Sequence, residues 1–150
     1  MEWEKAWFYW TRVIEIKNGK NSGKFIEYDK YGNIQFKGQY INGEINGEVK
    51  EYDKTKLTFD GEYLNGKRWK GKLKEYDYDG NISLEGEYIN GAINGKVKEY
   101  EEGKLIFDGE YLNGKRWKGK IKKYDYDGNI SLEGEYIGEI NGKKKMEKVN

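Results

Sequence analysis

Polar and apolar residues alternate along short stretches of this chain. Residues 82–88 read Ile-Ser-Leu-Glu-Gly-Glu-Tyr, so every second position is apolar or glycine and the positions between them are polar. A period of two is typical of a β-strand that buries one face. Asn-Gly or Asp-Gly pairs separate such stretches, as at Asn65-Gly66 and Asp79-Gly80, and these pairs favour tight hairpin turns because they tolerate positive φ. The pattern therefore predicts consecutive β-hairpins.

The hairpin pattern is itself repeated. Residues 59–89 and 107–137 differ at two positions, Leu73/Ile121 and Glu75/Lys123, which gives a long period of 48 residues. Gly-Glu-Tyr recurs inside it at alternating spacings of 25 and 23 residues. The recurrent structural positions are Gly61, Tyr63, Gly86, Tyr88, Gly109, Tyr111, Gly134 and Tyr136. We expect Tyr rings from neighbouring strands to lie against the backbone where these glycines leave space.

These repeats predict an all-β fold. We expect an elongated single-layer antiparallel β-meander of about six consecutive hairpins with sequential strand order. Residues 12–145 would form the repeats, residues 1–11 an aromatic N-terminal cap, and residues 146–150 a basic C-terminal tail. The cap is predicted from Trp3, Trp7 and Trp10, whose spacing matches one face of a helix. It would cover the first edge of the sheet, with self-association or lipid insertion as the alternatives.

The composition supports a folded chain and narrows its chemistry. Charged residues make up 37% and the mean hydropathy is −1.11, but the net charge is only +1 and aromatics reach 16%. Disordered chains are poor in aromatic residues. The chain has no Cys and no His, which excludes disulfides and Cys-ligated zinc and removes the usual general base. We therefore expect no enzyme and no cofactor. Without a signal peptide or an apolar run near the ~20 residues of a membrane span, we expect a cytoplasmic protein.

The pattern Gly-Glu-Tyr-x-Asn-Gly, followed by Gly-Lys-x-Lys and a later Tyr, resembles the MORN repeat over roughly residues 12–145. It is also similar to the looser bacterial MORN variant found in antitoxin-like proteins. The resemblance implies a hairpin unit of about 23 residues with a Tyr/Trp–Gly core pattern. It also permits phospholipid and membrane association.

A basic, Trp-bearing stretch, KRWKGK, stands at residues 67–72 and again at 115–120. It follows the Asn-Gly pair of its hairpin, where other units have three residues between glycines and these have four. We interpret it as part of the turn. A row of such turns could meet an anionic surface such as lipid headgroups. The alternative is a loop whose Trp folds back over the Tyr rings while its cations stay solvated. The candidate residues are Lys67, Arg68, Trp69, Lys70, Lys115, Arg116, Trp117 and Lys118.

Most other charges are predicted to cancel. Acids fall on one strand of each unit, as in Asp108 and Glu110, and lysines on the next, as in Lys120 and Lys122. Such residues can pair across an antiparallel sheet, so we expect no nucleic-acid partner, because a protein that binds nucleic acid usually carries a strong positive excess.

The stretch 77–81, Asp-Tyr-Asp-Gly-Asn, has its glycine fourth, whereas an EF-hand calcium loop needs it sixth. We predict a turn there and no metal site.

These observations favour a non-catalytic repeat scaffold, a protein-interaction module that associates with another protein or with a second copy of itself through its sheet. The aromatic face would be the surface to bury in that contact. The alternative is a peripheral module that binds anionic phospholipid through the Lys/Arg/Trp turns, at the membrane periphery.

Overall fold

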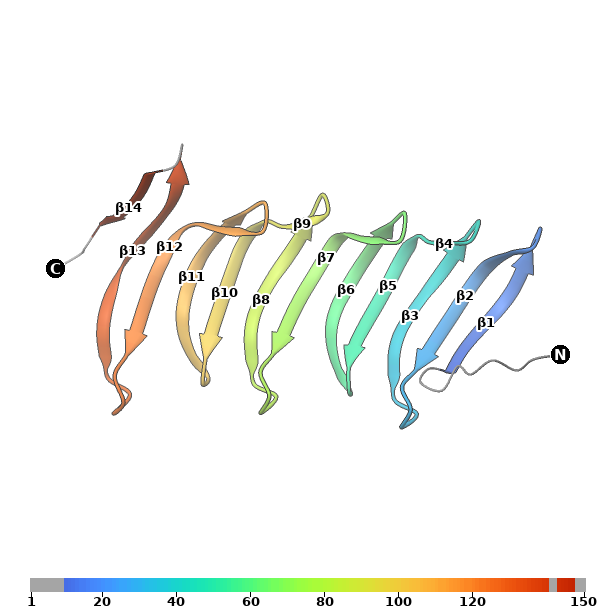
Figure 1. Ribbon diagram of the computed structural model, residues 1–150, viewed down its shortest axis with the longest axis horizontal. Coiled ribbons are helices and arrows are strands. Elements are labelled where there is room, and N and C mark those ends of the chain that lie inside the picture. Colours follow the sequence, from blue (N-terminus) through green and yellow to red (C-terminus); the bar gives the residue numbers. More distant parts are fainter. Residues whose placement is uncertain (1–9, 141–142, 148–150) are drawn as a thin grey trace. The chain divides into compact units, whose positions relative to one another are not determined.

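The computed structural model describes residues 10–140 and 143–147, and the side chains between Asn18 and Gly138. Every regular element in the described residues is a strand (Figure 1). Of the predicted cap, Trp3 and Trp7 lie outside the described residues, and Trp10 is the first residue of strand β1. The predicted tail begins inside the last strand, which ends at Glu147, and its remaining residues lie outside the described part.

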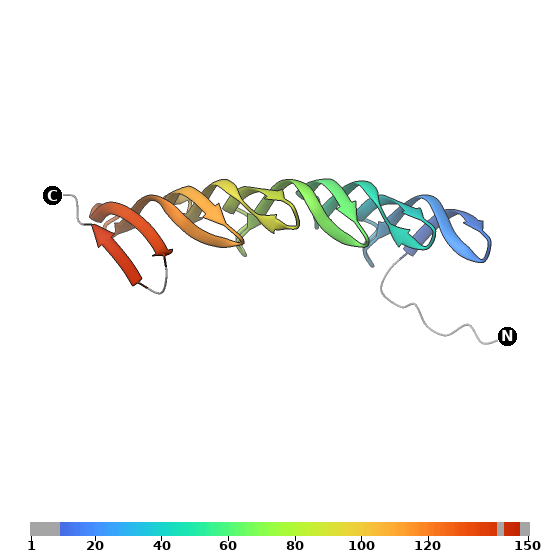
Figure 2. The same ribbon diagram turned by 90° about the horizontal axis from the view of Figure 1, so that it is seen from above.

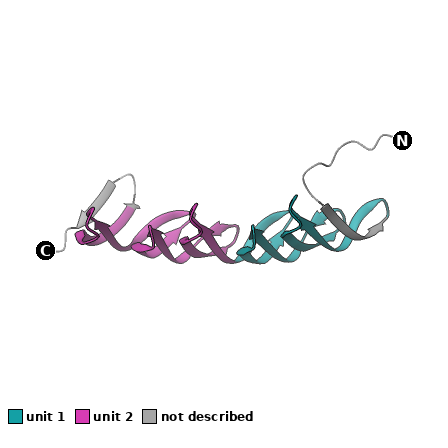
Figure 3. Ribbon diagram, turned by 90° about the horizontal axis from the view of Figure 1, so that it is seen from below, with its two compact units in different colours: residues 1–71 teal, residues 72–150 magenta. Residues whose placement is uncertain are grey.

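The chain divides into two compact units, Met1–Gly71 and Lys72–Asn150 (Figure 3). Strand β7 (Lys67–Tyr76) contributes its first five residues to the first unit and its last five to the second. The other strands of the first unit are β1 (Trp10–Lys17), β2 (Lys20–Tyr28), β3 (Ile34–Ile41), β4 (Glu44–Ile45), β5 (Gly47–Asp53) and β6 (Lys56–Leu64). Those of the second are β8 (Ile82–Ile89), β9 (Ala92–Ile93), β10 (Gly95–Glu101), β11 (Lys104–Leu112), β12 (Lys115–Tyr124), β13 (Ile130–Ile140) and β14 (Lys143–Glu147).

Within each unit the strands follow one another in chain order. The first unit pairs β1-β2-β3-β5-β6 and the second pairs β8-β10-β11-β12-β13-β14, with the short strands β4 and β9 paired to β3 and β8. The strand pairs of the described residues within each unit are antiparallel, and the strands are curved when viewed from above (Figure 2). The predicted all-β, single-layer antiparallel meander of consecutive hairpins is confirmed.

Two kinds of turn close the hairpins. At one end, two-residue turns such as Asn65-Gly66 adopt positive φ at both residues, 50° and 75°, the geometry that suits a tight hairpin. At the other end, the loop of residues 77–81 is held by the Asp77 carboxylate, whose Oδ1 accepts the backbone N–H of Asn81 at 2.8 Å. The Asp-Gly stretch is therefore a turn, as predicted. Among the described residues, no cluster of three acidic side chains could hold a metal ion.

A single-layer sheet still buries a core on one side, which we call the apolar face. Its fully buried residues are Phe25, Val49 and Phe59 in the first unit and Leu73, Val97 and Phe107 in the second, each at most 2% exposed. The prediction that Tyr rings fill the space beside the strand glycines is wrong for the best-packed sites, where the ring is Phe. A Cβ on Gly109 would lie 2.6 Å from the Phe107 Cζ and 2.6 Å from the Cα of Gly119 on the next strand. Paired glycines thus let a Phe ring lie directly on the backbone.

We predict that Gly109→Ala destabilises the protein by about 2–3 kcal/mol, because the added methyl group overlaps backbone atoms that cannot move aside. Urea unfolding followed by Trp fluorescence measures the change. Gly86→Ala is the matched control: its Cβ would lie 3.1 Å from a Val97 side-chain methyl, with only side-chain atoms near it, so its cost is expected below about 1 kcal/mol. Equal effects of the two substitutions would contradict this account of the glycine pair.

Candidate functional site: the charged face of the first unit

The KRWK stretches lie in strands, which corrects the prediction that they form turns. The two-residue turn closes at Gly66, so Lys67, Arg68, Trp69 and Lys70 are the first residues of β7, and Lys115, Arg116, Trp117 and Lys118 likewise open β12. Their extra residue is absorbed as a β-bulge. Glu110 pairs with Lys118 and Tyr111 with Arg116, which leaves Trp117 without an opposite residue. A bulge re-aims side chains without lengthening the turn.

Each arginine of these stretches turns onto the apolar face. Arg116 donates from Nε to the Glu99 Oε1 at 2.6 Å, and Tyr111 donates its hydroxyl to the same oxygen at 2.6 Å. The guanidinium lies over the Phe107 ring, with its Cζ 4.8 Å from the ring centroid. The first unit repeats this cluster with Arg68, Glu51, Tyr63 and Phe59, where Arg68 Nε donates to Glu51 Oε1 at 2.7 Å. Both arginines therefore cover buried Phe rings and are not available to an anionic partner.

Burial and hydrogen bonding in this cluster shift the pKa values of Glu99 and Tyr111. Burial raises the pKa of the Glu99 carboxyl, but the hydrogen bonds from Arg116 and Tyr111 outweigh it and hold the pKa below its usual value. Burial and the bond to Glu99 raise the pKa of Tyr111 to about 12. The Glu99 carboxylate and the Arg116 guanidinium consequently remain charged, as a pair, across the neutral range.

The lysines of these stretches divide into paired and unpaired. Lys70 lies 3.0 Å from Glu62 and Lys118 lies 3.4 Å from Glu110. In the described part of the chain, Lys67 and Lys115 are exposed and have no ion-pair partner. Trp69 is 38% exposed. Each stretch therefore offers one free lysine beside a tryptophan, which is a much weaker cationic feature than the four letters KRWK predict.

The side of the sheet opposite the apolar face, which we call the charged face, carries the predicted charge pairs. In the second unit, Glu85 faces Lys98, Lys98 faces Asp108, and Asp108 faces Lys120 across successive strands. Ion pairs such as Lys74–Glu85 at 3.1 Å and Lys122–Glu133 at 3.3 Å form along it. From β8 to β13 opposite charges therefore alternate across this face, which stabilises the sheet and cancels the field. The alternation ends at β14, where Glu147 faces Glu135.

The first unit breaks this alternation. Lys37 of β3 stands where β8 has Glu85, and it faces Lys50 of β5. Glu48 stands where β10 has Lys96, and it faces Glu62 of β6. Like charges directly opposite one another cost free energy in an antiparallel pair. Lys50 has an ion-pair partner in Asp60, at 2.6 Å, and Glu62 has one in Lys70, at 3.0 Å. Lys37 and Glu48 have no ion-pair partner among the described residues.

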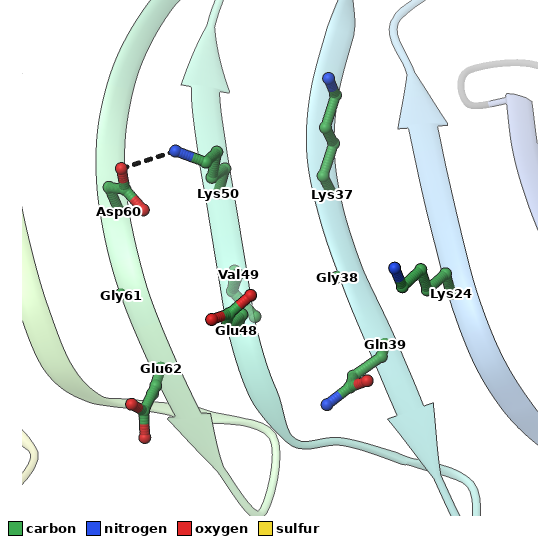
Figure 4. Close-up of a pocket in the computed structure, with 10 residues that line it drawn as sticks. All are labelled: Lys24, Lys37, Gly38, Gln39, Glu48, Val49, Lys50, Asp60, Gly61 and Glu62. Carbon is green, nitrogen blue, oxygen red and sulfur yellow. Dashed lines mark hydrogen bonds and ion pairs between the residues drawn. The ribbon is translucent and has the colours of Figure 1, made fainter.

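These side chains line a groove of about 530 Å³ on the charged face, which we call the first-unit groove (Figure 4). Lys24 and Lys37 come from β2 and β3, on one side of it, and have no ion-pair partner among the described residues. Glu48 and Glu62 come from β5 and β6, on the other side. The lining residues are Lys24, Lys37, Gly38, Gln39, Glu48, Val49, Lys50, Asp60, Gly61 and Glu62. The groove therefore presents separated positive and negative sides to a partner.

Sequence reasoning missed this site although the signal was present. It compared the two nearly identical copies, residues 59–89 and 107–137, and used their agreement. The informative comparison is with the first copy, where Lys37, Gln39 and Glu48 differ in charge from the residues 48 positions later, Glu85, Glu87 and Lys96.

No protein-family model matches the chain, and the search of curated proteins finds no match either. Within the described residues, no helix is long and apolar enough to cross a membrane.

We predict that Lys37→Glu stabilises the protein by up to about 1 kcal/mol, because it replaces a like-charge pair with an opposite-charge pair facing Lys50. Thermal unfolding at low salt and low protein concentration measures the gain, which should shrink at high salt. The converse substitution Glu85→Lys in the second unit is the matched control and should destabilise by a similar amount. A loss of stability in Lys37→Glu would contradict the assignment of an unfavourable pair.

The Arg116–Glu99 cluster predicts a loss of stability in acid. A carboxyl whose pKa is lower in the folded than in the unfolded protein stabilises the fold above the unfolded pKa. This contribution is lost as the pH falls from neutral to below the ordinary glutamate pKa of about 4.3 and through the folded pKa. Glu99→Gln should cost about 1–3 kcal/mol at neutral pH, and its difference from the wild type should shrink in acid. Urea unfolding across this pH range measures both. Glu87→Gln, at an exposed position, is the control, and a constant Glu99→Gln difference at all pH values would argue against the pair.

Proposed function

We propose that this chain is a MORN-like, non-catalytic repeat scaffold that binds a protein partner through the first-unit groove. The observation that carries the proposal is the loss of charge alternation in the first copy, where Lys37 faces Lys50 and Glu48 faces Glu62. A local arrangement that costs stability, and that the corresponding strands β8, β10 and β11 of the second unit avoid, is typical of a surface kept for binding.

The closure of the apolar face supports the same choice of surface. Phe59 and Phe107 are 0% exposed, so the aromatic side of each unit is already covered by its own Tyr and Arg side chains. A partner on that side would have to displace the Arg–Glu pairs. The charged face is open, and its side chains are solvated: Lys50 and Asp60 are 47% and 46% exposed. An open groove with solvated charges suits recognition of another polar surface.

The test is a comparison of captured protein between the wild type and a variant with restored alternation, Lys37→Glu/Glu48→Lys. The net charge is unchanged, so non-specific binding is matched. We expect proteins captured from a cell lysate by the wild type to fall at least tenfold on this variant, as quantified by mass spectrometry. The same exchange in the second unit, Glu85→Lys/Lys96→Glu, is the control and should retain them. Equal capture by the wild type and the first variant would overturn the proposal. So would the absence of any partner, whether a captured protein or a second copy of the chain, whose binding depends on Lys37 and Glu48.

The alternative function, binding of anionic phospholipid, has one supporting observation, the exposure of Trp69 next to the free Lys67. It is weakened by the ion pairs of Arg68 and Lys70. Co-sedimentation with anionic and neutral vesicles at about 0.15 M salt separates the two functions. The scaffold proposal predicts protein in the supernatant with both. Selective pelleting with anionic vesicles that Trp69→Ala/Trp117→Ala abolishes would favour the lipid module.

A further inference from the structure

The charges of the first-unit groove are sorted by strand. Lys24 and Lys37 lie on β2 and β3, and Glu48 and Glu62 lie on β5 and β6. Lys50 is held by Asp60 on the same face. The groove therefore has a positive half over β2–β3 and a negative half over β5–β6. In the second unit the residues 48 positions later face opposite charges, Glu85 facing Lys98 and Lys96 facing Glu110. The first unit is therefore the one in which like charges stand side by side on this face.

An apolar rim lies at one end of the same face. Ile41 and Leu64 are the last residues of β3 and β6, and each precedes an Asn-Gly turn. Because side chains alternate along a strand, Ile41 is on the side of Gln39 and Leu64 is on the side of Glu62. The two side chains are 47% and 45% exposed. The two turns are adjacent, since the Gly66 N–H donates to the Ile45 carbonyl at 2.9 Å.

We propose that the partner of this groove is a second copy of the same chain, bound face to face about a two-fold axis that lies between β3 and β5 and runs parallel to the strands. This inference rests on the proposed function and names its partner. Such an axis reverses the strand order of the second copy, so β2 lies over the partner's β6 and β3 over the partner's β5. The positive half over β2–β3 then faces the partner's negative half over β5–β6, twice over by symmetry. Lys24 lies at the level of the partner's Glu62, and Lys37 lies at the level of the partner's Lys50–Asp60 pair.

The same axis also places the apolar rims together. Rotation about a direction parallel to the strands leaves their ends at the same level, so Ile41 of one copy and Leu64 of the other lie at the same level, one strand apart, twice by symmetry. The other in-plane axis, perpendicular to the strands, would put each strand over its own copy, so the positive half would face the positive half and the negative half the negative half. The charged halves and the apolar rims therefore favour the same arrangement of the two copies. An unrelated charged peptide would not match both features.

The test exchanges the signs of the two halves and measures association by analytical ultracentrifugation. Lys24→Glu/Lys37→Glu makes both halves negative, and Glu48→Lys/Glu62→Lys makes both halves positive. Each variant alone should dissociate at least tenfold more readily than the wild type, because like charges then face each other. An equimolar mixture should form a one-to-one heterodimer, since the negative variant meets the positive one in both halves. Restored association of the mixture also shows that both variants are folded.

Controls with the same charge changes are placed on the second unit. Glu87→Lys/Glu110→Lys and Lys96→Glu/Lys120→Glu should leave the dimer intact, and Glu110 has its own lysine partner, Lys118, just as Glu62 has Lys70. The wild-type dimer should weaken as salt is raised. A wild type that stays monomeric at all concentrations, or a mixture that does not associate, would overturn the dimer. If another captured protein still depended on Lys37 and Glu48, the scaffold function would stand, and if nothing depended on them both would fall.

Discussion

The structure depends on the packing of a phenylalanine ring against a pair of glycines in neighbouring strands. Phe107 lies over Gly109 and Gly119, and Phe59 lies over Gly61 and Gly71. The missing side chains bring the ring onto the backbone, and the arginine at the start of the next strand closes over it, held by a glutamate 17 residues earlier in the chain. A sheet of one layer can bury an apolar core in this way without a second layer. Loss of either the glycine pair or the arginine would open the core to water.

The closed apolar face determines where the protein can interact. With the rings covered, the outward surface is a set of alternating charges, which holds the strands together and presents little net field. In such a surface a break in the alternation is the distinctive feature. The first unit has one at Lys37 and Glu48, where like charges that face each other reduce the stability of the sheet. The groove thus depends on charged residues that differ among the repeats, whereas the fold depends on the phenylalanine and glycine positions that the repeats share.

Much of the fold could be predicted from the sequence, because strand alternation and Asn-Gly turns are local signals. The antiparallel hairpins and the Asp77 turn followed from them. The place of KRWKGK did not, because the bulge at Trp117 depends on its register against Glu110 and Tyr111, which no local pattern specifies. Nor could the role of Arg116 be predicted, since its partner Glu99 lies on another hairpin. The prediction that tyrosine rings pack beside the strand glycines overlooked the phenylalanines, which are few in the sequence but occupy buried positions.

The most direct measurement is lysine footprinting, in which the acylation rate of each lysine is determined by mass spectrometry at low and at high protein concentration. The account predicts that Lys24 and Lys37 lose reactivity as the protein associates, while lysines on the second unit's charged face, such as Lys72 and Lys96, keep theirs. Protection of Lys67 and Lys115 with unchanged reactivity at Lys24 and Lys37 would contradict it and return attention to the Trp-bearing strands.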